Sequence, residues 1–295
     1  MASVDPQTVS KIYGPGGLDF LIEDVDKLVS LPDIYYRLES AIVDPTTSTD
    51  TIALLLQSDP DLCARLLRMA NSAFYSFPAK IETIDRAVNT IGLRQIRELI
   101  LVTSVVKAFS GIPLDMVNMS MFWEHSISVG IMARALGQHA KLPNSENFYI
   151  PGLLHDIGRL VLYLKLPELM HDLLLQRRHQ RKNLFQLENQ CLGYSNAEIG
   201  GRLLEIWKLP QSIYQPIAEH HDPSQGNEFE VVSCVIHVAD AWVDANRLDS
   251  NGDISDPLTC PEALPMLDID TDEVEQIGRK AAEQTRDVLR QFVSH

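Results

Sequence analysis

Residues 151–162 read PGLLHDIGRLVL, a stretch that sets two polar residues inside an otherwise apolar pattern. The apolar positions recur at helical spacing and should share one buried face: Leu153, Leu154, Ile157, Leu160 and Val161. A polar side chain left on such a face without a partner costs about 2–7 kcal/mol, and an unpaired carboxylate costs more. His155 and Asp156 must therefore find partners, either elsewhere in the chain or in a bound ligand.

The composition indicates a globular protein that does not work mainly on nucleic acid. Hydrophobic residues make up 45% of the 295 positions, which is ordinary for a soluble domain. The net charge is −15, whereas binding to a phosphate backbone needs a concentrated cationic face. The one basic cluster, residues 177–182, is short and is expected to be a solvated helix end.

The sequence also predicts a cytoplasmic protein with no membrane segment. Its first residues show neither the charged region nor the apolar region of a signal peptide. The longest apolar stretch, residues 99–109, is interrupted by polar residues and is too short to cross a bilayer. Four cysteines lie far apart without paired spacing, which fits a reducing compartment: Cys63, Cys191, Cys234 and Cys260.

Nearly every segment has helical periodicity, so the sequence predicts an all-α fold. We expect a tail over residues 1–17, a domain over 18–246, and an acidic linker followed by a last helix over 247–295. A hinge near residues 110–114 would divide the domain into lobes at 18–112 and 113–246. Within the first lobe, Asp59 and Pro60 form a helix start signal. Within the second, one helix is expected over residues 147–164.

Two more polar residues fall on apolar helical faces. His125 shares its face with apolar residues such as Val129 and Met132, and Asp240 is flanked by Ile236 and Val243. Singly, each is most simply a hydrogen-bonded core residue. Together with His155 and Asp156, however, the cost of burying these four polar side chains would be offset best if they bound one divalent cation. Imidazole and carboxylate donors suit manganese, iron, nickel or magnesium.

This order of residues resembles the HD superfamily of metal-dependent phosphohydrolases. Longer blocks are similar to the HDOD family, the HD-related output domain of bacterial signalling proteins: SLPDIYYRLESAIVDP, LLLQSDPDLCARLLRMANSAFYS, IDRAVNTIGLRQIRELIL, WEHSISVGIMARAL, GLLHDIGRLVL, IGGRLLEIWKLP and EHHDP. They follow in the family's order over residues 20–245. The resemblance implies an N-terminal helical lobe packed on an HD-like helical bundle. It also implies one divalent ion with four protein ligands: His125, His155, Asp156 and Asp240.

The chain departs from the related HD-GYP phosphodiesterases in three ways. Asn196 stands where a further metal-binding histidine is expected, and no GYP signature follows His220 and His221. Arg159 replaces the lysine expected after HDIG. Hydrolysis through two metals needs ions about 3.5–4 Å apart, and an asparagine oxygen is a weak ligand for a second ion.

The resemblance therefore implies most directly a non-catalytic signal-transduction module that works through protein partners, with a structural or ligand-sensing pocket. The first alternative is a phosphohydrolase for a nucleotide or cyclic nucleotide. Its catalytic residues would be Asp156, Arg159, His220 and His221. A second alternative is a binding protein for another phosphate-bearing ligand. The last helix could dock on its own domain or serve a homodimer.

Overall fold

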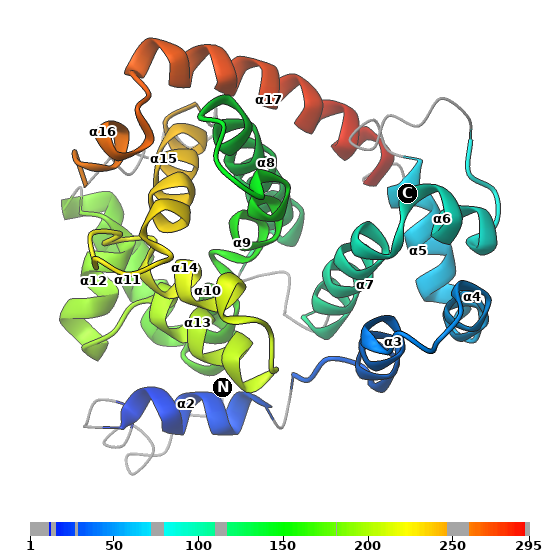
Figure 1. The fold of residues 1–295 in the computed structure, drawn as a ribbon. Coiled ribbons are helices and arrows are strands. Elements are labelled where there is room, and N and C mark those ends of the chain that lie inside the picture. The colour runs from blue at the N-terminus through cyan, green and yellow to red at the C-terminus, as the bar shows by residue number, and fades with distance from the viewer. Residues whose placement is uncertain are drawn as a thin grey trace. The chain divides into compact units, whose positions relative to one another are not determined.

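The computed structural model describes residues 12, 16–26, 29–71, 80–109, 117–180, 182–246 and 260–292, in which every regular element is a helix (Figure 1). The prediction of an all-α fold is confirmed. Internal contacts divide the chain into two units. The larger unit is Met1–Leu28 with Ile112–Ala282, and the smaller unit is Val29–Gly111 with Glu283–His295. The division between Gly111 and Ile112 lies one residue from the predicted lobe boundary.

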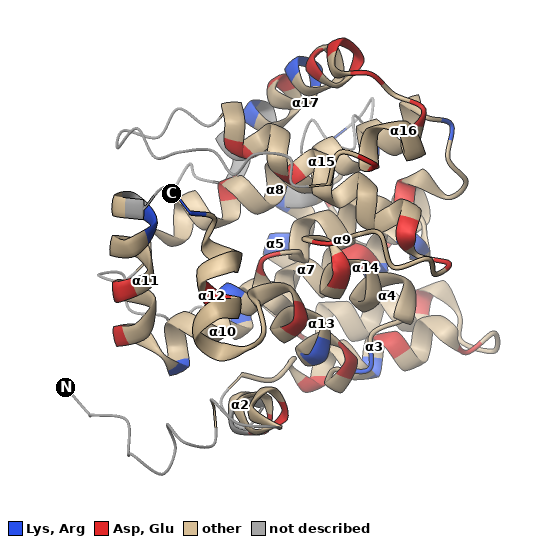
Figure 2. Ribbon diagram, turned by 90° about the vertical axis from the view of Figure 1, so that its left-hand side faces the viewer, with Lys and Arg blue, Asp and Glu red and all other residues tan. Residues whose placement is uncertain are grey.

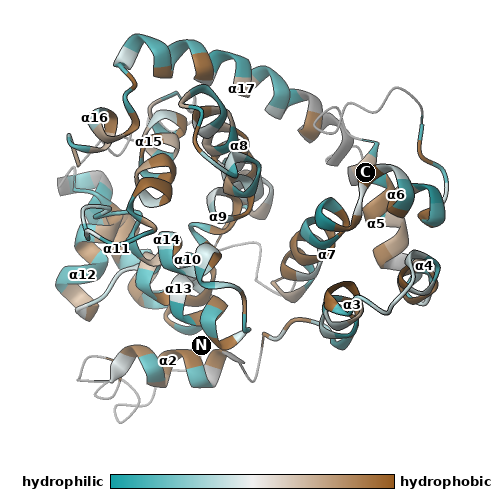
Figure 3. Ribbon diagram, in the orientation of Figure 1, coloured by the Kyte–Doolittle hydropathy of each residue, from teal (hydrophilic) through white to brown (hydrophobic). Residues whose placement is uncertain are grey.

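The larger unit contains residues 151–162, which we call the HD stretch. Its helices are α2 (Gly17–Asp26), α8 (Met119–His139), the short 3-10 helix η1 (Ser145–Phe148), α9 (Tyr149–Leu154), α10 (Ile157–Lys165), α11 (Pro167–Gln180), α12 (Leu184–Leu192), α13 (Asn196–Ile206), α14 (Gln211–Glu219), α15 (Glu230–Asn246) and α16 (Ala263–Leu267). α17 (Thr271–Phe292) is assigned to this unit through Ala282. α8 packs against α9 and α15, and α13 packs against α10 and α14. Hydrophobic residues are frequent in α8, α9 and α15, whereas α17 is hydrophilic over much of its circumference (Figure 3).

The helix expected over residues 147–164 is interrupted at the HD pair. α9 ends at Leu154 and α10 begins at Ile157, so His155 and Asp156 form the turn between them. Asp156 has φ −97° and ψ 8°, outside the helical region, and its carbonyl oxygen accepts the Arg159 N–H at 2.9 Å. The apolar periodicity continues across the turn, which is why the pattern alone predicted one helix. We refer to residues 155–156 as the HD turn.

α2 belongs to the larger unit, although the sequence placed residues 18–112 in one lobe. It packs on α13 and α10, and Arg202 Nε donates to Asp19 Oδ1 at 2.8 Å. Leu21, Ile22 and Val25 form its buried face. An amphipathic pattern shows that a helix buries one face, but not which neighbour covers it.

The predicted linker is also shorter than expected. Residues 260–270 include α16, which packs on α15 and buries Ala263 and Leu267. The Cys260 N–H donates to His237 Nε2 at 3.1 Å, and His237 Nδ1 lies 2.9 Å from the carbonyl oxygen of His220. This segment is therefore part of the larger unit. Most of the predicted tail, and residues 247–259 of the linker, lie outside the described residues.

The smaller unit is a set of short helices. They are α3 (Asp33–Val43), α4 (Thr49–Gln57), α5 (Pro60–Ala70), α6 (Ile84–Ile91) and α7 (Leu93–Ala108). As expected, α5 starts at Pro60, and Asp59 Oδ1 accepts the Leu62 N–H at 3.0 Å. Arg97 on α7 forms a two-point ion pair with Glu39 on α3, in which Nε donates to Oε2 at 2.7 Å.

Asn71 joins two separated backbone segments of the smaller unit. Its Nδ2 donates to the carbonyl oxygens of Leu67 and Ile81, both at 2.7 Å. Its Oδ1 accepts the Ile81 N–H at 2.8 Å. One amide side chain thus fixes the chain after α5 to the chain before α6.

None of the described helices combines the length and the apolar character that a membrane span requires.

Acidic residues outnumber basic ones by 40 to 25, and Figure 2 shows both kinds spread over many helices.

Candidate metal centre

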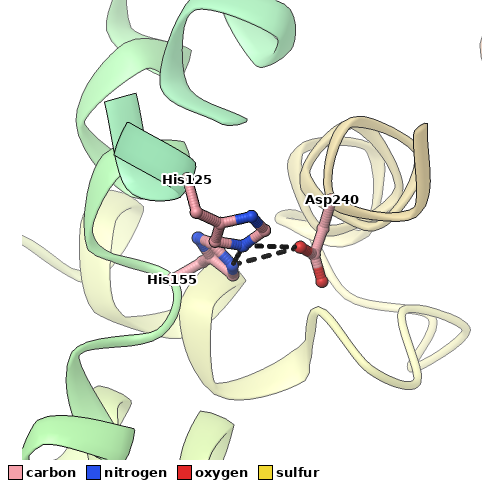
Figure 4. A group of neighbouring side chains, drawn as sticks. All are labelled: His125, His155 and Asp240. Carbon is pink, nitrogen blue, oxygen red and sulfur yellow. Dashed lines mark hydrogen bonds and ion pairs between the residues drawn. The ribbon is translucent and has the colours of Figure 1, made fainter. Parts of the chain in front are cut away.

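Three side chains from separate parts of the larger unit converge on one point (Figure 4). His125 comes from the second turn of α8, His155 from the HD turn and Asp240 from α15. His125 Nε2 lies 3.1 Å from Asp240 Oδ1 and 3.3 Å from His155 Nε2. His155 Nε2 lies 3.3 Å from the same oxygen of Asp240. The two nitrogens and the oxygen are therefore close enough to bind a single cation.

A neighbouring oxygen lies next to Nδ1 of both imidazole rings in this triad, and among the described residues a hydrogen bond orients the ring of His155 alone. His155 Nδ1 is 2.8 Å from the carbonyl oxygen of Gly152, so Nδ1 carries the proton and Nε2 is the nitrogen that can bind an ion. His125 Nδ1 lies 3.4 Å from Asp244 Oδ1, one turn beyond Asp240 on α15. A carboxylate behind a histidine ring is a common support for a metal-binding imidazole.

Charge strongly perturbs the titration of His155 and Asp240. Burial would lower the pKa of His155, but the Asp156 and Asp240 carboxylates raise it to about 9. Burial opposes ionisation of Asp240, yet His155 and His125 hold the pKa of that carboxyl well below its usual value. Burial and the charge of Asp240 raise the pKa of Asp244. Without a bound cation, the positive charge of protonated His155 offsets part of the negative charge of these carboxylates.

Asp156 points to other partners. Its Oδ2 forms an ion pair with Arg159, and its Oδ1 accepts a hydrogen bond from Asn196 Nδ2 at 2.8 Å. Burial would raise the pKa of Asp156, and the Arg159 guanidinium, followed by His155, lowers it. The same Oδ2 lies 3.6 Å from His155 Nε2 and 3.9 Å from His125 Nε2. Asp156 therefore borders the triad while both of its oxygens are engaged outside it.

His220 and His221 approach from the end of α14. His220 Nδ1 lies 2.7 Å from the carbonyl oxygen of Ile217, and its buried Nε2 has no hydrogen-bond partner in the described part of the chain. Burial, followed by His155, lowers the pKa of His220 to about 4. His155, Asp156 and His220 form a second group whose ligand atoms lie within 4.8 Å of one another.

The two groups share His155. Its Nδ1 faces Gly152, so a single nitrogen, Nε2, is available to both. One lone pair binds one cation at a time. The donors therefore suit one ion better than two.

A glycine in the HD stretch makes this arrangement possible. A Cβ on Gly158 would lie 1.9 Å from the backbone oxygen of Asn196 and 2.7 Å from the nitrogen of Gly200. α10 and α13 thus approach backbone to backbone, which brings Asn196 within hydrogen-bond distance of Asp156.

All residues that the sequence analysis proposed for the metal site, its possible chemistry or its departures from the HD-GYP pattern lie in the larger unit: His125, His155, Asp156, Arg159, Asn196, His220, His221 and Asp240. Sequence reasoning missed Asp244 and Glu188. Asp244 follows Asp240 by four residues on one helical face, a spacing that could have revealed it. Glu188 is completely buried on α12 and accepts the Asn196 N–H at 2.8 Å. A glutamate next to Leu187 in an amphipathic helix gave no comparable signal.

The residues present fit a divalent cation. In the described part of the chain, four side-chain carboxylates lie around the site, namely Asp156, Glu188, Asp240 and Asp244, and Arg159 forms ion pairs with Asp156 and Glu188. Two imidazoles and a carboxylate suit manganese, iron or nickel, whereas magnesium prefers oxygen donors.

The sequence model of one protein family, described as the HDOD domain, matches residues 28–223 of this chain. This chain belongs to the HDOD family. An HDOD domain protein of unknown function from Geobacter sulfurreducens has a similar crystal structure, with a TM-score of 0.76 and 26% identity, covering 94% of this chain and 98% of that one. A candidate phosphohydrolase from Shewanella amazonensis has a TM-score of 0.71 and 24% identity, covering 92% and 97%.

Two further relatives differ from this HDOD protein in length. A candidate signal transduction protein from Marinobacter aquaeolei has a TM-score of 0.73 and 18% identity, covering 96% of this chain and 63% of that one. An uncharacterized protein from Treponema pallidum is 23% identical over 254 residues, which cover 81% of this chain and 48% of that protein. The chain thus spans about half the length of the curated relative that it matches.

Proposed function

We propose that this HDOD protein is a cytoplasmic signal-transduction module that binds one divalent cation and acts through contacts with other proteins. The ion is held by His125, His155 and Asp240, with water completing its shell. One observation carries the proposal: three donor atoms converge at 3.1–3.3 Å, while both oxygens of the adjacent Asp156 are engaged elsewhere. The arrangement favours an ion with a structural or sensing role over a two-ion hydrolytic centre.

A bound ion links α8, α15 and the HD turn. A ligand that binds only the folded state stabilises it by RT ln(1 + [L]/Kd), which is about 2.7 kcal/mol at a concentration of 100 Kd. Occupancy of the pocket is thereby coupled to the stability of the larger unit. The signalling role rests on the likeness of the sequence blocks to output domains and agrees with the description of the relative from Marinobacter aquaeolei.

The test is elemental analysis of the purified protein, followed by thermal unfolding with a chelator and after addition of manganese or magnesium. We expect one ion per chain, a lower melting temperature after chelation, and recovery with manganese but not with magnesium. Asp240→Asn should abolish the response. Asp172→Asn, an exposed position on α11, should keep it. A protein that holds no metal and is indifferent to added manganese, iron and nickel would disprove the metal site.

One observation favours a second candidate, the phosphohydrolase. The group of His155, Asp156 and His220 includes a buried imidazole nitrogen with an open lone pair. If Asp156 exchanged its partners for an ion, that ion could lower the pKa of a bound water, with His220 or His221 as general base. A screen over nucleotides, cyclic dinucleotides and simple phosphodiesters tests this reaction. We expect no turnover above background. Product release that is lost in Asp156→Ala would establish the hydrolase instead.

A further inference from the structure

The amide of Asn196 has a defined orientation and two pocket partners. A carboxylate can only accept hydrogen bonds, so the nitrogen Nδ2 must face Asp156 Oδ1 at 2.8 Å. The amide oxygen then faces His221 Nε2 at 2.9 Å, so that nitrogen of His221 must carry a proton.

Asn196 is also immobilised. It is completely buried, and its backbone N–H donates to Glu188 Oε2 at 2.8 Å. Its backbone oxygen lies directly over Gly158. The ring of His221 is stacked on Phe185, with centroids 4.3 Å apart and planes at 14°. Neither end of the hydrogen-bonded chain from Asp156 to His221 can turn away without losing a contact.

The hydrogen bonds from Asp156 through Asn196 to His221 close the protonated Nε2 of His221 to a cation and fix the direction of the Asp156 carboxylate, although each of its oxygens keeps a further lone pair. Asp156 offers Oδ1 to Asn196 and Oδ2 to Arg159, and His221 offers its Nε2 proton to Asn196. The second group of potential ligands needs an oxygen of Asp156, while His220 Nε2 beside it is buried without a hydrogen-bond partner in the described part of the chain. In that group, His155 also belongs to the first group and Asp156 is hydrogen-bonded to Asn196, so His220 is the donor that has neither tie among the described residues.

We propose that Asn196 determines the stoichiometry of the pocket: by engaging Asp156 and His221, it restricts the site to one ion. This inference rests on the proposed metal site and concerns which residue limits the number of ions that the site binds. Asn196 acts as a positioning residue, because it is argued to work through Asp156 rather than by touching the ion.

The test replaces Asn196 by a residue of the same size that cannot donate a hydrogen bond to Asp156. Asn196→Asp puts a carboxylate next to Asp156, which breaks the hydrogen bond, adds an oxygen donor and raises the negative charge of the pocket. Asn189→Asp is the matched control, since it adds the same charge at an exposed position on α12. Asn196→Ser removes the amide without adding charge and serves if Asn196→Asp does not fold.

Manganese binding is measured by titration calorimetry and by the magnetic coupling that two neighbouring Mn²⁺ ions show in electron paramagnetic resonance. We expect one ion for wild type and Asn189→Asp. Asn196→Asp should bind two coupled ions, and Asn196→Ser should bind a second, weaker one. One ion in wild type and in both Asn196 variants would overturn the inference while leaving the metal site intact. Two ions in wild type would also overturn it. No ion in wild type would refute the proposed function itself.

Discussion

Asp244 Oδ1 lies 3.4 Å from Nδ1 of His125, on the side of the imidazole ring away from Asp240. α15 thus supplies one carboxylate beside the ion position and a second behind a ligand ring. A carboxylate that accepts a hydrogen bond from the second nitrogen of a ligand histidine fixes the ring and raises its basicity, and its loss typically weakens metal binding 10–100-fold. We expect Asp244→Asn to weaken manganese binding about tenfold without changing its stoichiometry. Calorimetry checks this, with Asp172→Asn as control, and an unchanged affinity would exclude a supporting role for Asp244.

The binding of manganese should depend steeply on pH. The pKa of His155 is raised to about 9, so His155 is protonated at neutral pH and must lose a proton before Nε2 can bind the ion. Below pH 9 the apparent affinity should therefore rise about tenfold per pH unit and level off above it. Calorimetry in two buffers of different ionisation enthalpy measures the proton released, which we expect to be one per ion at pH 7. Binding without proton release would show that His155 is already neutral.

Gly158→Ala should disrupt the pocket through the backbone. The new Cβ would lie 1.9 Å from the oxygen of Asn196, so α10 and α13 must move apart. Overpacking of this kind costs about 1–3 kcal/mol, and here the obstacle is backbone that cannot rotate away. We expect a lower melting temperature together with weaker manganese binding. The control is Gly193→Asn, at a helix end with φ 83° and nothing within 4 Å of its Cβ, where asparagine is tolerated. Equal stability of Gly158→Ala and wild type would contradict the close approach.

Asn71→Ala should destabilise the smaller unit and leave the pocket unaffected. It removes one side chain that makes three hydrogen bonds and leaves backbone groups of Ile81 unpaired, at a cost of about 1–3 kcal/mol. Asn89→Ala, which removes one exposed bond to Asp85, is the control. Denaturant unfolding measures the loss of stability, and manganese titration of the folded variant should give the wild-type affinity. A changed affinity would mean that the two units do not act independently.

Local patterns predicted the helices and singled out polar residues that the structure brings close together, His125, His155 and Asp240, but they did not predict how the helices combine. The start of α5 was readable because Asp59 and Pro60 act on their own helix. The interruption at the HD turn was not, because the apolar spacing continues across it. The role of Asn196 was also hidden: its residue type suggested a weak ligand, whereas the structure places it between Asp156 and His221. Such roles depend on contacts between residues 25 to 40 positions apart, which periodicity does not encode.

His237 has a consequence for how this protein can be shortened. Its ring connects the Cys260 N–H to the carbonyl oxygen of His220, so a segment well beyond α15 supports the backbone of a pocket histidine. The family match ends at residue 223, before both His237 and Asp240. A fragment excised at the limits of the match would lack one of the three donors, and its failure to bind metal would say nothing about the intact protein. A fragment meant to retain the pocket should extend from residue 12 to residue 282, the end of the larger unit.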